Sequence, residues 1–232
     1  MVENLSNIFK NHEDAATKLL DILPIKQLQE EKYLLLGLSL DAVLILETIA
    51  KKTGLNYDFL FSEPIYAPNN QECAVAIVSE EEEIVIQEAL ANSFDINLEY
   101  LYFEAHRKYE ELILKNIYKY RKGMSSSLYE KQNILFIDEG CETGNRVFVA
   151  LKTVINKGAK SASFAVPVIA EDTAEVLDKC LDEIFYVNKI TNFVDTKFYY
   201  TSSQKLSSEV ILAILESSKN YLPFQKSQGE EK

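Results

Sequence analysis

Cysteine is scarce in this chain: Cys73, Cys141 and Cys180 are the only three among 232 residues. The number is odd and the spacing is wide, which argues against a disulfide framework and against the closely spaced ligands of a zinc knuckle. Free thiols are typical of a reducing compartment, so we expect a cytoplasmic protein.

Positive charge is also in short supply. Lysine and arginine number 24 against 36 aspartates and glutamates, so the formal net charge is −12. An acidic protein repels the phosphate backbone of nucleic acids unless its basic residues gather in a patch, and the sequence has no such patch. We therefore expect no nucleic-acid partner.

Long apolar runs are missing as well. No stretch approaches the ~18 consecutive apolar residues that suggest a membrane-spanning helix. The first residues, Met1–Asn4, lack the basic and apolar regions of a secretory signal peptide, so we expect none. The prediction is a soluble protein without a membrane partner.

Apolar side chains, in contrast, make up 47% of the residues and include 13 Tyr and 12 Phe. This composition excludes disorder over most of the chain and suffices for one substantial core. The length favours a single domain, which we place at residues 1–222, followed by a tail at 223–232.

Short apolar runs alternate with helical patterns, which predicts an α/β fold. Runs that indicate strands lie at 33–37, 57–61, 133–137, 163–169, 184–187 and 198–200. Patterns that indicate helices lie at 12–23, 41–53, 143–156, 172–181 and 207–215. Asp41 is the expected N-cap of the second helix, Gly54 its end, and Asp172 or Thr173 the N-cap of the fourth. We predict a mostly parallel twisted sheet flanked by helices, with ligands at the carboxyl ends of its strands.

Residues 64–130 depart from this alternation and predict a small hood subdomain. The stretch 64–70 is rich in Pro and Asn and predicts a loop. Strands at 74–78 and 84–86 form a hairpin, and Glu80–Glu83 suggest its solvated tip.

The longest helical pattern of the chain follows at 98–120, and the small polar residues 123–127 predict a mobile loop. The helical pattern is rich in Tyr and Phe, which are enriched in interface cores, and it exceeds what the sheet needs for its own cover. We therefore expect a homodimer.

The chemistry is concentrated between Ile134 and Arg146, where the sequence reads ILFIDEGCETGNR. A buried strand ends in two carboxylates, Asp138 and Glu139, and a turn with two glycines leads into a helix. Backbone N–H groups of such a turn and of a helix N-terminus bind anions, whereas carboxylates suit sugar hydroxyls or Mg²⁺. The pattern predicts a ligand with both a phosphate and hydroxyls, such as a phosphorylated sugar.

This stretch resembles the motif of type I phosphoribosyltransferases that binds 5-phosphoribosyl 1-diphosphate (PRPP), in which two acidic residues and three others precede Thr-Gly-x-Thr. Further similarity to bacterial phosphoribosyltransferase-domain proteins lies at 9–15, 67–74, 120–123 and 165–168, within about residues 9–215. The resemblance implies the fold of that family, transfer of the phosphoribosyl group from PRPP to a nucleobase, release of pyrophosphate and use of Mg²⁺.

The resemblance also implies roles for the residues of the motif. Asp138 and Glu139 would bind the ribose hydroxyls and Mg²⁺. The 5′-phosphate would lie within the turn made by Gly140, Cys141, Thr143, Gly144 and Asn145. Glu142 takes the place of an Asp that accepts the proton of the base in enzymes similar to hypoxanthine-guanine phosphoribosyltransferase, which favours a purine and makes Glu142 the candidate general base.

Plainer interpretations of these residues stay open. The turn is also compatible with an ordinary strand–helix loop, and Glu142 with a solvated residue. Cys141 is either a reactive thiol at a helix N-terminus or a small residue that fills the turn. His12 is expected only to begin the first helix.

Five positions depart from the family's pattern at the sites of the diphosphate and the 5′-phosphate. Ser39, Leu40 and Asp41 stand where the pyrophosphate loop often has Arg-Gly-Gly, and Glu63 stands where a Lys is common. Arg146 replaces the last Thr of the motif and is a charged donor for a phosphate.

Arg121 begins the segment before the loop at 123–127. It is either part of a lid over pyrophosphate or a solvated helix end. Two functions follow: a phosphoribosyltransferase, or a protein of the same fold that binds a nucleotide or phosphoribosyl ligand without turnover in a regulatory role.

Overall fold

The structure is a computed structural model and describes residues 8–68, 70–124, 129–203 and 205–225. Most of the predicted mobile loop, 125–127, lies outside the described residues, and so does the tail from 226 onward. Within the described ranges, no helix combines the length and the apolar character needed to cross a membrane.

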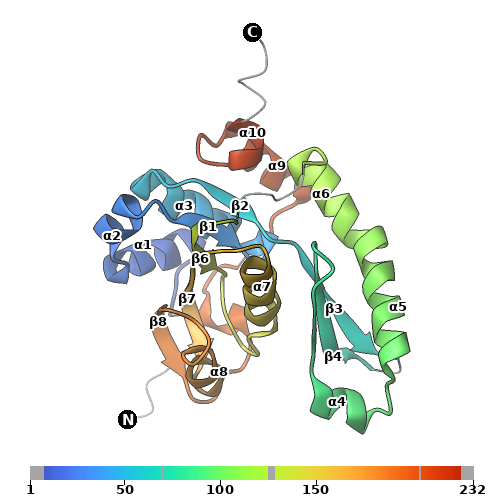
Figure 1. Cartoon of the computed structure of the whole chain (residues 1–232). Helices are drawn as coiled ribbons and strands as arrows, with labels where there is room; N and C mark the ends of the chain where they lie inside the picture. The colour runs from blue at the N-terminus through green and yellow to red at the C-terminus, as the bar shows by residue number, and fades with distance from the viewer. Residues whose placement is uncertain (1–7, 69, 125–128, 204, 226–232) are drawn as a thin grey trace.

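Five parallel strands form the main sheet, in the order β2-β1-β6-β7-β8 (Figure 1). Their bounds are β1 Leu34–Gly37, β2 Tyr57–Phe59, β6 Asn133–Ile137, β7 Ser161–Ala170 and β8 Ile184–Ile190. Every residue of β1, β2 and β6 is buried, because helices cover both faces of a parallel sheet. The predicted α/β class and parallel sheet are confirmed.

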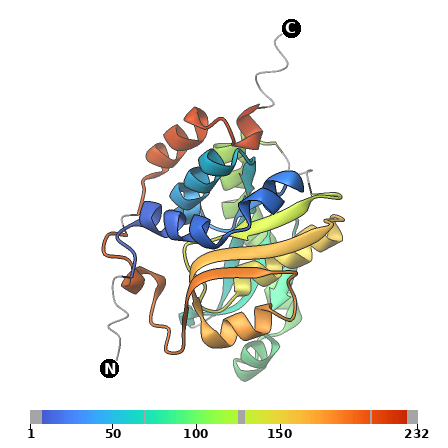
Figure 2. The ribbon, with the colours of Figure 1, turned by 90° about the vertical axis from the view of Figure 1, so that its left-hand side faces the viewer.

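The two faces of the sheet bury different sets of side chains. Leu35 belongs to the core beneath α1 (His12–Ile22) and α3 (Val43–Thr53), whereas its neighbours Leu34 and Leu36 belong to the core beneath α7 (Asn145–Asn156) and α8 (Glu171–Leu177). This alternation is the period of two that a strand imposes. Figure 2 shows the helices on both sides of the sheet.

Shorter elements complete this body. They are α2 Ile25–Glu30, the 3₁₀ turns η1 Leu40–Ala42 and η3 Thr196–Tyr199, α9 Ser208–Ser217 and α10 Leu222–Gln225. Pro223 and Phe224 are buried, so the predicted tail does not begin at residue 223.

The hood is an antiparallel sheet of three strands with a long helix beside it (Figure 1). Its elements are β3 Ser62–Ala67, β4 Asn70–Ser79, β5 Ile84–Ile86, α4 Glu88–Ser93, α5 Leu98–Lys108, the π-turn η2 Tyr109–Ile113 and α6 Leu114–Arg121. The predicted hairpin and long helix are confirmed. The loop predicted at 64–70 is wrong, because β3 is an edge strand and an edge strand tolerates Pro64.

Three other local predictions are wrong. Phe198 and Tyr199 belong to η3, and Tyr200 forms only an isolated parallel bridge with Phe9, so residues 198–200 are not a strand. The Asp195 side chain accepts a hydrogen bond from the Lys197 amide at 2.9 Å. Asp41 lies within η1 and caps no helix, since α3 begins only at Val43. Helix α8 begins at Glu171, ahead of both predicted caps. Gly54 does end α3, in the left-handed conformation expected of it (φ 72°).

Arg121 links the hood to the main sheet through ion pairs with Glu80 of the hood and Asp58 of β2. Its side chain is 1% exposed; Nε donates to Asp58 Oδ1 at 3.0 Å, and Nη2 donates to Glu80 Oε1 at 2.9 Å. Nη2 also donates to the Phe59 carbonyl, and the guanidinium lies 4.9 Å from the centre of the Phe61 ring. Arg121 is therefore neither a lid residue nor a solvated helix end, and Glu80 is not part of a solvated tip.

Candidate functional site

The cleft of the candidate site lies at the carboxyl end of β6. Its volume is about 350 Å³, and it separates the turn after β6 from strands β3 and β4 of the hood. The body contributes Asp138, Thr196 and residues 140–147, and the hood contributes Pro64, Tyr66, Glu72, Ala74 and Ile77. Ligands of parallel sheets bind at this edge, so the cleft is where the fold itself predicts a site.

The turn between β6 and α7 is held to the neighbouring strand. The Cys141 amide donates to the Val168 carbonyl, and the Ala170 amide donates to the Cys141 carbonyl, both at 2.9 Å. Gly144 has φ 72° and is the N-cap of α7. Since glycine has no side chain to cap the helix, the N–H groups of the first turn are left for water or an anion.

Both glycines of the turn are in crowded places. A Cβ at Gly140 would lie 2.4 Å from Oγ1 of Thr196, and a Cβ at Gly144 would lie 3.1 Å from Cγ2 of Thr173. The positive φ of Gly144 confirms that this position needs a backbone form that side chains disfavour. The turn therefore has a defined shape, which an anion site requires.

Asp138 is buried at the floor of the cleft. Its Oδ1 accepts hydrogen bonds from the Ser39 hydroxyl at 2.5 Å and from the Glu139 amide at 2.9 Å. Its Oδ2 lies 3.5 Å from Nη1 of Arg146, a side chain that is about half exposed. Burial raises the pKa of Asp138, and Arg146 and Ser39 oppose that shift. The structure thus brings three residues of the predicted site into contact: Asp138, Ser39 and Arg146.

Glu139 turns away from Asp138 and contacts His12 and Tyr200. We call these two residues the clamp; the sequence did not predict it. His12 Nε2 lies 2.8 Å from Glu139 Oε2, and the Tyr200 hydroxyl donates to the Glu139 carbonyl at 2.7 Å. The rings of His12 and Tyr200 stack with centroids 4.9 Å apart. His12 is therefore more than the start of a helix.

Backbone hydrogen bonds between Phe9 and residues 199–201, which we call the strap, hold this clamp in place. The Phe9 amide donates to the Tyr199 carbonyl at 2.9 Å, and the Thr201 amide donates to the Phe9 carbonyl at 2.8 Å. Burial raises the pKa of Tyr200, so its hydroxyl stays a donor. The clamp borders a second, smaller hollow that is lined by His12, Asp41, Leu44, Glu139, Lys197, Ser203, Lys205 and Leu206.

Carboxylates dominate the charge beside the phosphate turn. The pKa of Arg146 is raised, first by Asp138 and then also by Glu139 and Asp41. Burial raises the pKa of Glu63, against the opposing charges of Lys108 and Arg146. Asp41 and Glu63 therefore add negative charge near Arg146, as their places in the sequence predict. Leu40 is half-buried at the start of η1 and packs against the core.

The other residues of the turn divide into exposed and buried. The side chains of Glu142 and Thr143 are exposed. Asn145 Oδ1 accepts a hydrogen bond from Nε2 of Gln87, a residue of the hood, at 2.5 Å. The Cys141 thiol is buried, and burial, followed by the charge of Asp138, raises its pKa to about 12. Cys141 thus fills the turn and is not a reactive thiol.

The carboxylates do not fit a magnesium site built by the protein alone. Among the described residues no three His, Cys, Asp or Glu side chains are grouped to hold a metal ion. The oxygens of Asp138 already face Ser39, the Glu139 amide and Arg146, and Glu139 faces His12.

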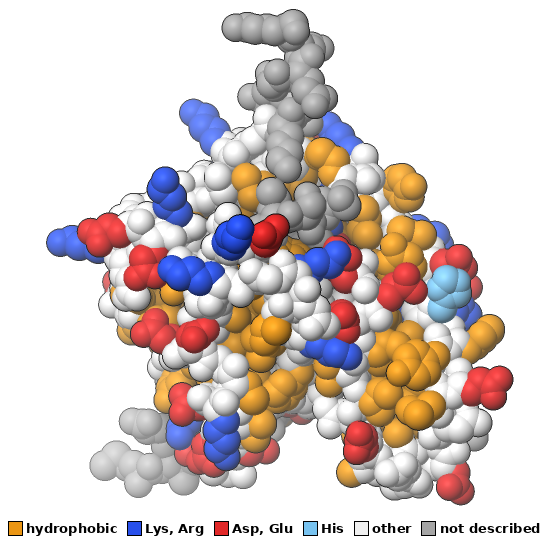
Figure 3. Space-filling view, viewed as in Figure 1, with side chains coloured by type: hydrophobic (Ala, Val, Ile, Leu, Met, Phe, Trp, Pro, Cys, Tyr) orange, Lys and Arg blue, Asp and Glu red, His pale blue; other side chains and the backbone are white. Residues whose placement is uncertain are grey.

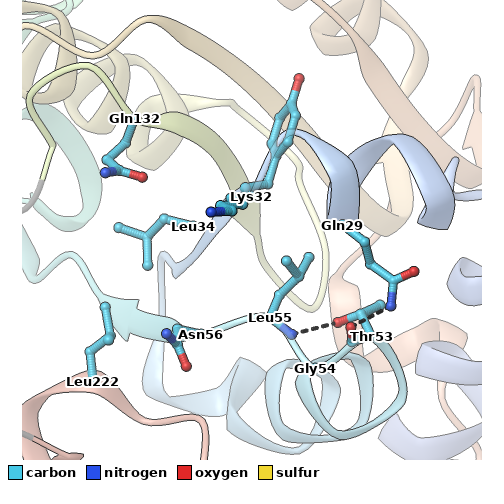
Figure 4. A pocket seen from close by; sticks show the side chains of 10 residues that line it. Gln29, Lys32, Leu34, Thr53, Gly54, Leu55, Asn56, Gln132 and Leu222 are labelled. Carbon is cyan, nitrogen blue, oxygen red and sulfur yellow. Dashed lines mark hydrogen bonds between the residues drawn. The ribbon is translucent and has the colours of Figure 1, made fainter.

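A cavity larger than the cleft lies at the opposite edge of the sheet, where β1 and β2 begin (Figure 4). Its volume is about 480 Å³, and Lys32, Gln132, Asn56 and Leu222 are among its lining residues. Gln29 Nε2 donates to the Thr53 carbonyl at 2.6 Å on one wall. Its lining includes neither a carboxylate nor a glycine turn before a long helix, so it lacks the features of the predicted site.

Comparisons with known proteins agree with the fold. No protein-family model matches the sequence, and no curated protein does. The solved structure of TT1426 from Thermus thermophilus matches with a TM-score of 0.71 and 24% identity, over 89% of this chain and 96% of that chain. This likeness shows a shared fold.

Phosphoribosyltransferases are also among the matched structures. A purine phosphoribosyltransferase from Pyrococcus horikoshii matches with a TM-score of 0.42 and 14% identity, over 78% of this chain and 89% of that chain. A hypoxanthine phosphoribosyltransferase from Staphylococcus aureus matches with a TM-score of 0.44 and 12% identity, over 79% of this chain and 76% of that chain.

Proposed function

We propose that this protein transfers the 5-phosphoribosyl group from PRPP to a nucleobase, with a purine favoured, and releases pyrophosphate. The observation that carries the proposal is the placement of a buried carboxylate, Asp138, beside the glycine turn that opens α7. A phosphate and sugar hydroxyls need these two surfaces next to each other, and both border the same cleft.

The turn would hold the 5′-phosphate. The first N–H groups of α7 and those of Glu142 and Thr143 would supply donors, since the Cys141 amide already donates to the Val168 carbonyl. The helix N-terminus adds a favourable field. Arg146, half exposed at the cleft, supplies a full positive charge. Thr143, whose side chain is exposed, adds a hydroxyl donor.

Asp138 would bind the ribose hydroxyls. Ser39 fixes one of its oxygens, and the other lies near Arg146, so the carboxylate has a defined orientation before a ligand arrives. A preoriented acceptor loses little entropy on binding. Glu139, whose carboxylate contacts His12, would help to hold the neighbouring Asp138 in place at the floor of the cleft.

In the transfer step, the bond between ribose C1′ and the diphosphate oxygen breaks, and its electron pair leaves with pyrophosphate. A nitrogen of the base forms the new bond to C1′. The proton of that nitrogen passes to Glu142, whose exposed carboxylate borders the cleft. Because the described side chains build no magnesium site of their own, no step assigned here depends on Mg²⁺.

The second candidate is a protein that binds a phosphoribosyl ligand or nucleotide without turnover. Asp41 and Glu63 favour it, because they add negative charge where the diphosphate of PRPP would lie. A like charge at about 4 Å is worth roughly 4 kcal/mol at an effective dielectric of about 20. A ligand with one phosphate avoids this repulsion.

The experiment is a calorimetric titration with PRPP and with ribose 5-phosphate, with and without Mg²⁺, followed by an assay of pyrophosphate release across common bases. If the protein is a phosphoribosyltransferase, it should bind PRPP and release pyrophosphate with at least one base. Binding without turnover on any base would support the second candidate, and no binding of either ligand would refute both.

Two variants separate the roles of the carboxylates. Glu142→Gln should bind PRPP as the wild type does and lower turnover by about 10²–10⁴-fold, the usual contribution of a positioned base. Asp138→Asn should weaken binding itself, because the amide changes the acceptor set at the ribose. Equal turnover in Glu142→Gln and wild type would remove the base role.

A further inference from the structure

The cavity at the amino ends of β1 and β2 has the size of a ligand site but takes no part in the proposed reaction. Its volume of about 480 Å³ lies within the range of about 300–1,000 Å³ that is usual for small-molecule pockets. It shares no lining residue with the cleft. A molecule bound there would therefore not compete with a ligand in the cleft.

Segments that are far apart in the sequence form the walls of this cavity. Figure 4 shows four of its side chains around one space: Lys32 before β1, Asn56 before β2, Gln132 before β6 and Leu222 of α10. Gln225 Nε2 donates to Asn56 Oδ1 at 3.0 Å, which holds α10 beside the start of β2. The walls are thus in place before a ligand arrives, and a preformed cavity binds with a smaller loss of entropy.

The inner surface of the cavity is largely apolar. Leu34 and Leu55 are buried, Leu222 is half-buried, and the buried Tyr33 adds an aromatic ring. Removal of apolar ligand surface from water stabilises a complex by about 25 cal/mol per Å². The lining therefore favours a ligand with an apolar body.

The charge of the lining differs from that of the rest of the protein. Acidic side chains are spread over the face of the molecule that Figure 3 shows, and the chain has 36 Asp and Glu against 24 Lys and Arg. Among the described residues, the lining includes Lys32 but no Asp and no Glu. Glu30 and Glu31, just before Lys32, are exposed and lie outside the lining.

Two polar groups of the lining are available to a ligand. Within the described part of the chain, the Lys32 ammonium has no carboxylate partner and the side-chain amide of Gln132 has no hydrogen-bond partner. An ammonium group pairs with a carboxylate or a phosphate, and an amide adds a hydrogen bond to either. The lining therefore favours a ligand with an anionic head group.

The turn that carries Lys32 has a close counterpart elsewhere in the protein. Lys32 has φ 53° at the end of α2, a position where glycine is usual because side chains disfavour this backbone form. Lys131 has φ 60° and is also exposed, but it pairs with Glu130 at 3.3 Å and does not line the cavity. Lys131 is therefore a matched control for Lys32.

We propose that this cavity binds a small amphipathic organic anion. The apolar body of the ligand lies against Leu34, Leu55 and Leu222. Its carboxylate or phosphate pairs with the Lys32 ammonium and accepts a hydrogen bond from Gln132. This site goes beyond the proposed function and does not depend on it, because the cavity and the cleft have no residue in common.

The first test is a calorimetric titration with 2-naphthoate and 2-naphthamide, which have the same apolar body and differ in charge. The wild type should bind 2-naphthoate at least about tenfold more tightly than the amide, as expected for a charge-assisted hydrogen bond. Lys32→Met should remove this difference, whereas Lys131→Met should keep it. Equal affinities for the two probes in the wild type, no binding of 2-naphthoate, or the same loss in both variants would overturn the proposal.

The second test locates the bound probe. The chain has no tryptophan, so one introduced indole reports on its own surroundings. The emission of Gln132→Trp should change with 2-naphthoate at the concentrations that saturate the calorimetric titration. The emission of Phe103→Trp, at a position on α5 of the hood that is 66% exposed, should stay constant. Equal changes in both variants, or no change in Gln132→Trp, would overturn the proposal; circular dichroism confirms that each variant is folded.

Discussion

Removal of the Arg121 guanidinium should destabilise the protein more than any change to a surface ion pair. The side chains of Arg121, Asp58 and Glu80 are exposed by only 1%, 4% and 1%. In Arg121→Met a flexible side chain fills part of the space, but two carboxylates stay buried without their cation. Breaking such a buried group costs about 3–5 kcal/mol of the free energy of unfolding.

For a chain of this size, 1 kcal/mol corresponds to about 2–4 °C in Tm. We therefore expect Arg121→Met to unfold about 6–20 °C below the wild type by calorimetry. Arg107→Met is the matched control, because Arg107 also contacts two glutamates but is 42% exposed. Exposed pairs contribute about 0–1 kcal/mol, so the control should lose less than about 4 °C.

The effect of pH gives an independent check. Burial raises the pKa of Glu80, and Arg121 opposes that shift. Without Arg121 the pKa of Glu80 in the folded state rises further, and the folded protein takes up a proton. A raised carboxyl pKa favours the folded state at low pH, and this benefit is lost as pH rises through the folded pKa.

The deficit of Arg121→Met should therefore be smaller at about pH 5 than at about pH 8. Adding Glu80→Gln to Arg121→Met should recover part of the stability at the higher pH, since it removes one unpaired charge. A Tm within about 2 °C of the wild type, or a deficit that does not change with pH, would refute the reasoning.

Three further predictions concern the phosphate turn and the clamp. Gly144→Val should stay folded but lose the thermal stabilisation by ribose 5-phosphate, because valine disfavours φ 72°; undiminished stabilisation would contradict the site. Cys141, with a pKa of about 12, is protonated at neutral pH and should resist iodoacetamide in the native protein while Cys180 reacts, as peptide mass spectrometry can show. His12→Phe keeps a ring but loses the contact with Glu139, so urea unfolding should show a loss of about 1–3 kcal/mol, and His12→Gln should lose less; equal losses would remove the hydrogen bond as the cause.

The sheet was predictable because its strands are buried on both faces. Runs such as Leu34–Gly37 and Asn133–Ile137 are continuously apolar and short, and the helices between them have clear helical spacing. The turn after Asp138 was predictable for a related reason. A strand, two glycines and a helix start are local features, and local features are visible in a sequence.

The errors have two physical sources. Pro64 is rare within sheets but tolerated at an edge, and no sequence pattern tells which strand lies at the edge. The buried polar contacts join residues far apart in the chain: His12 to Glu139 spans 127 positions, and Arg121 to Asp58 spans 63. Glu80 is the first of four adjacent glutamates, and only the packing of the hood distinguishes it from Glu82, which is not buried.

The strap between Phe9 and Thr201 sets a condition on how the protein is made. Residue 9 emerges from the ribosome about 190 positions before its partners at 199 and 201. At synthesis rates of about 5–20 residues per second, that interval lasts roughly 10–40 s. During this time His12 lacks Tyr200, and Glu139 lacks it over the last 61 positions of the interval; Tyr200 contacts both of them in the finished protein. We therefore expect the sheet to assemble on the nascent chain while the floor of the cleft closes last, so that chains truncated before residue 199 keep the phosphate turn but lack a fixed Glu139.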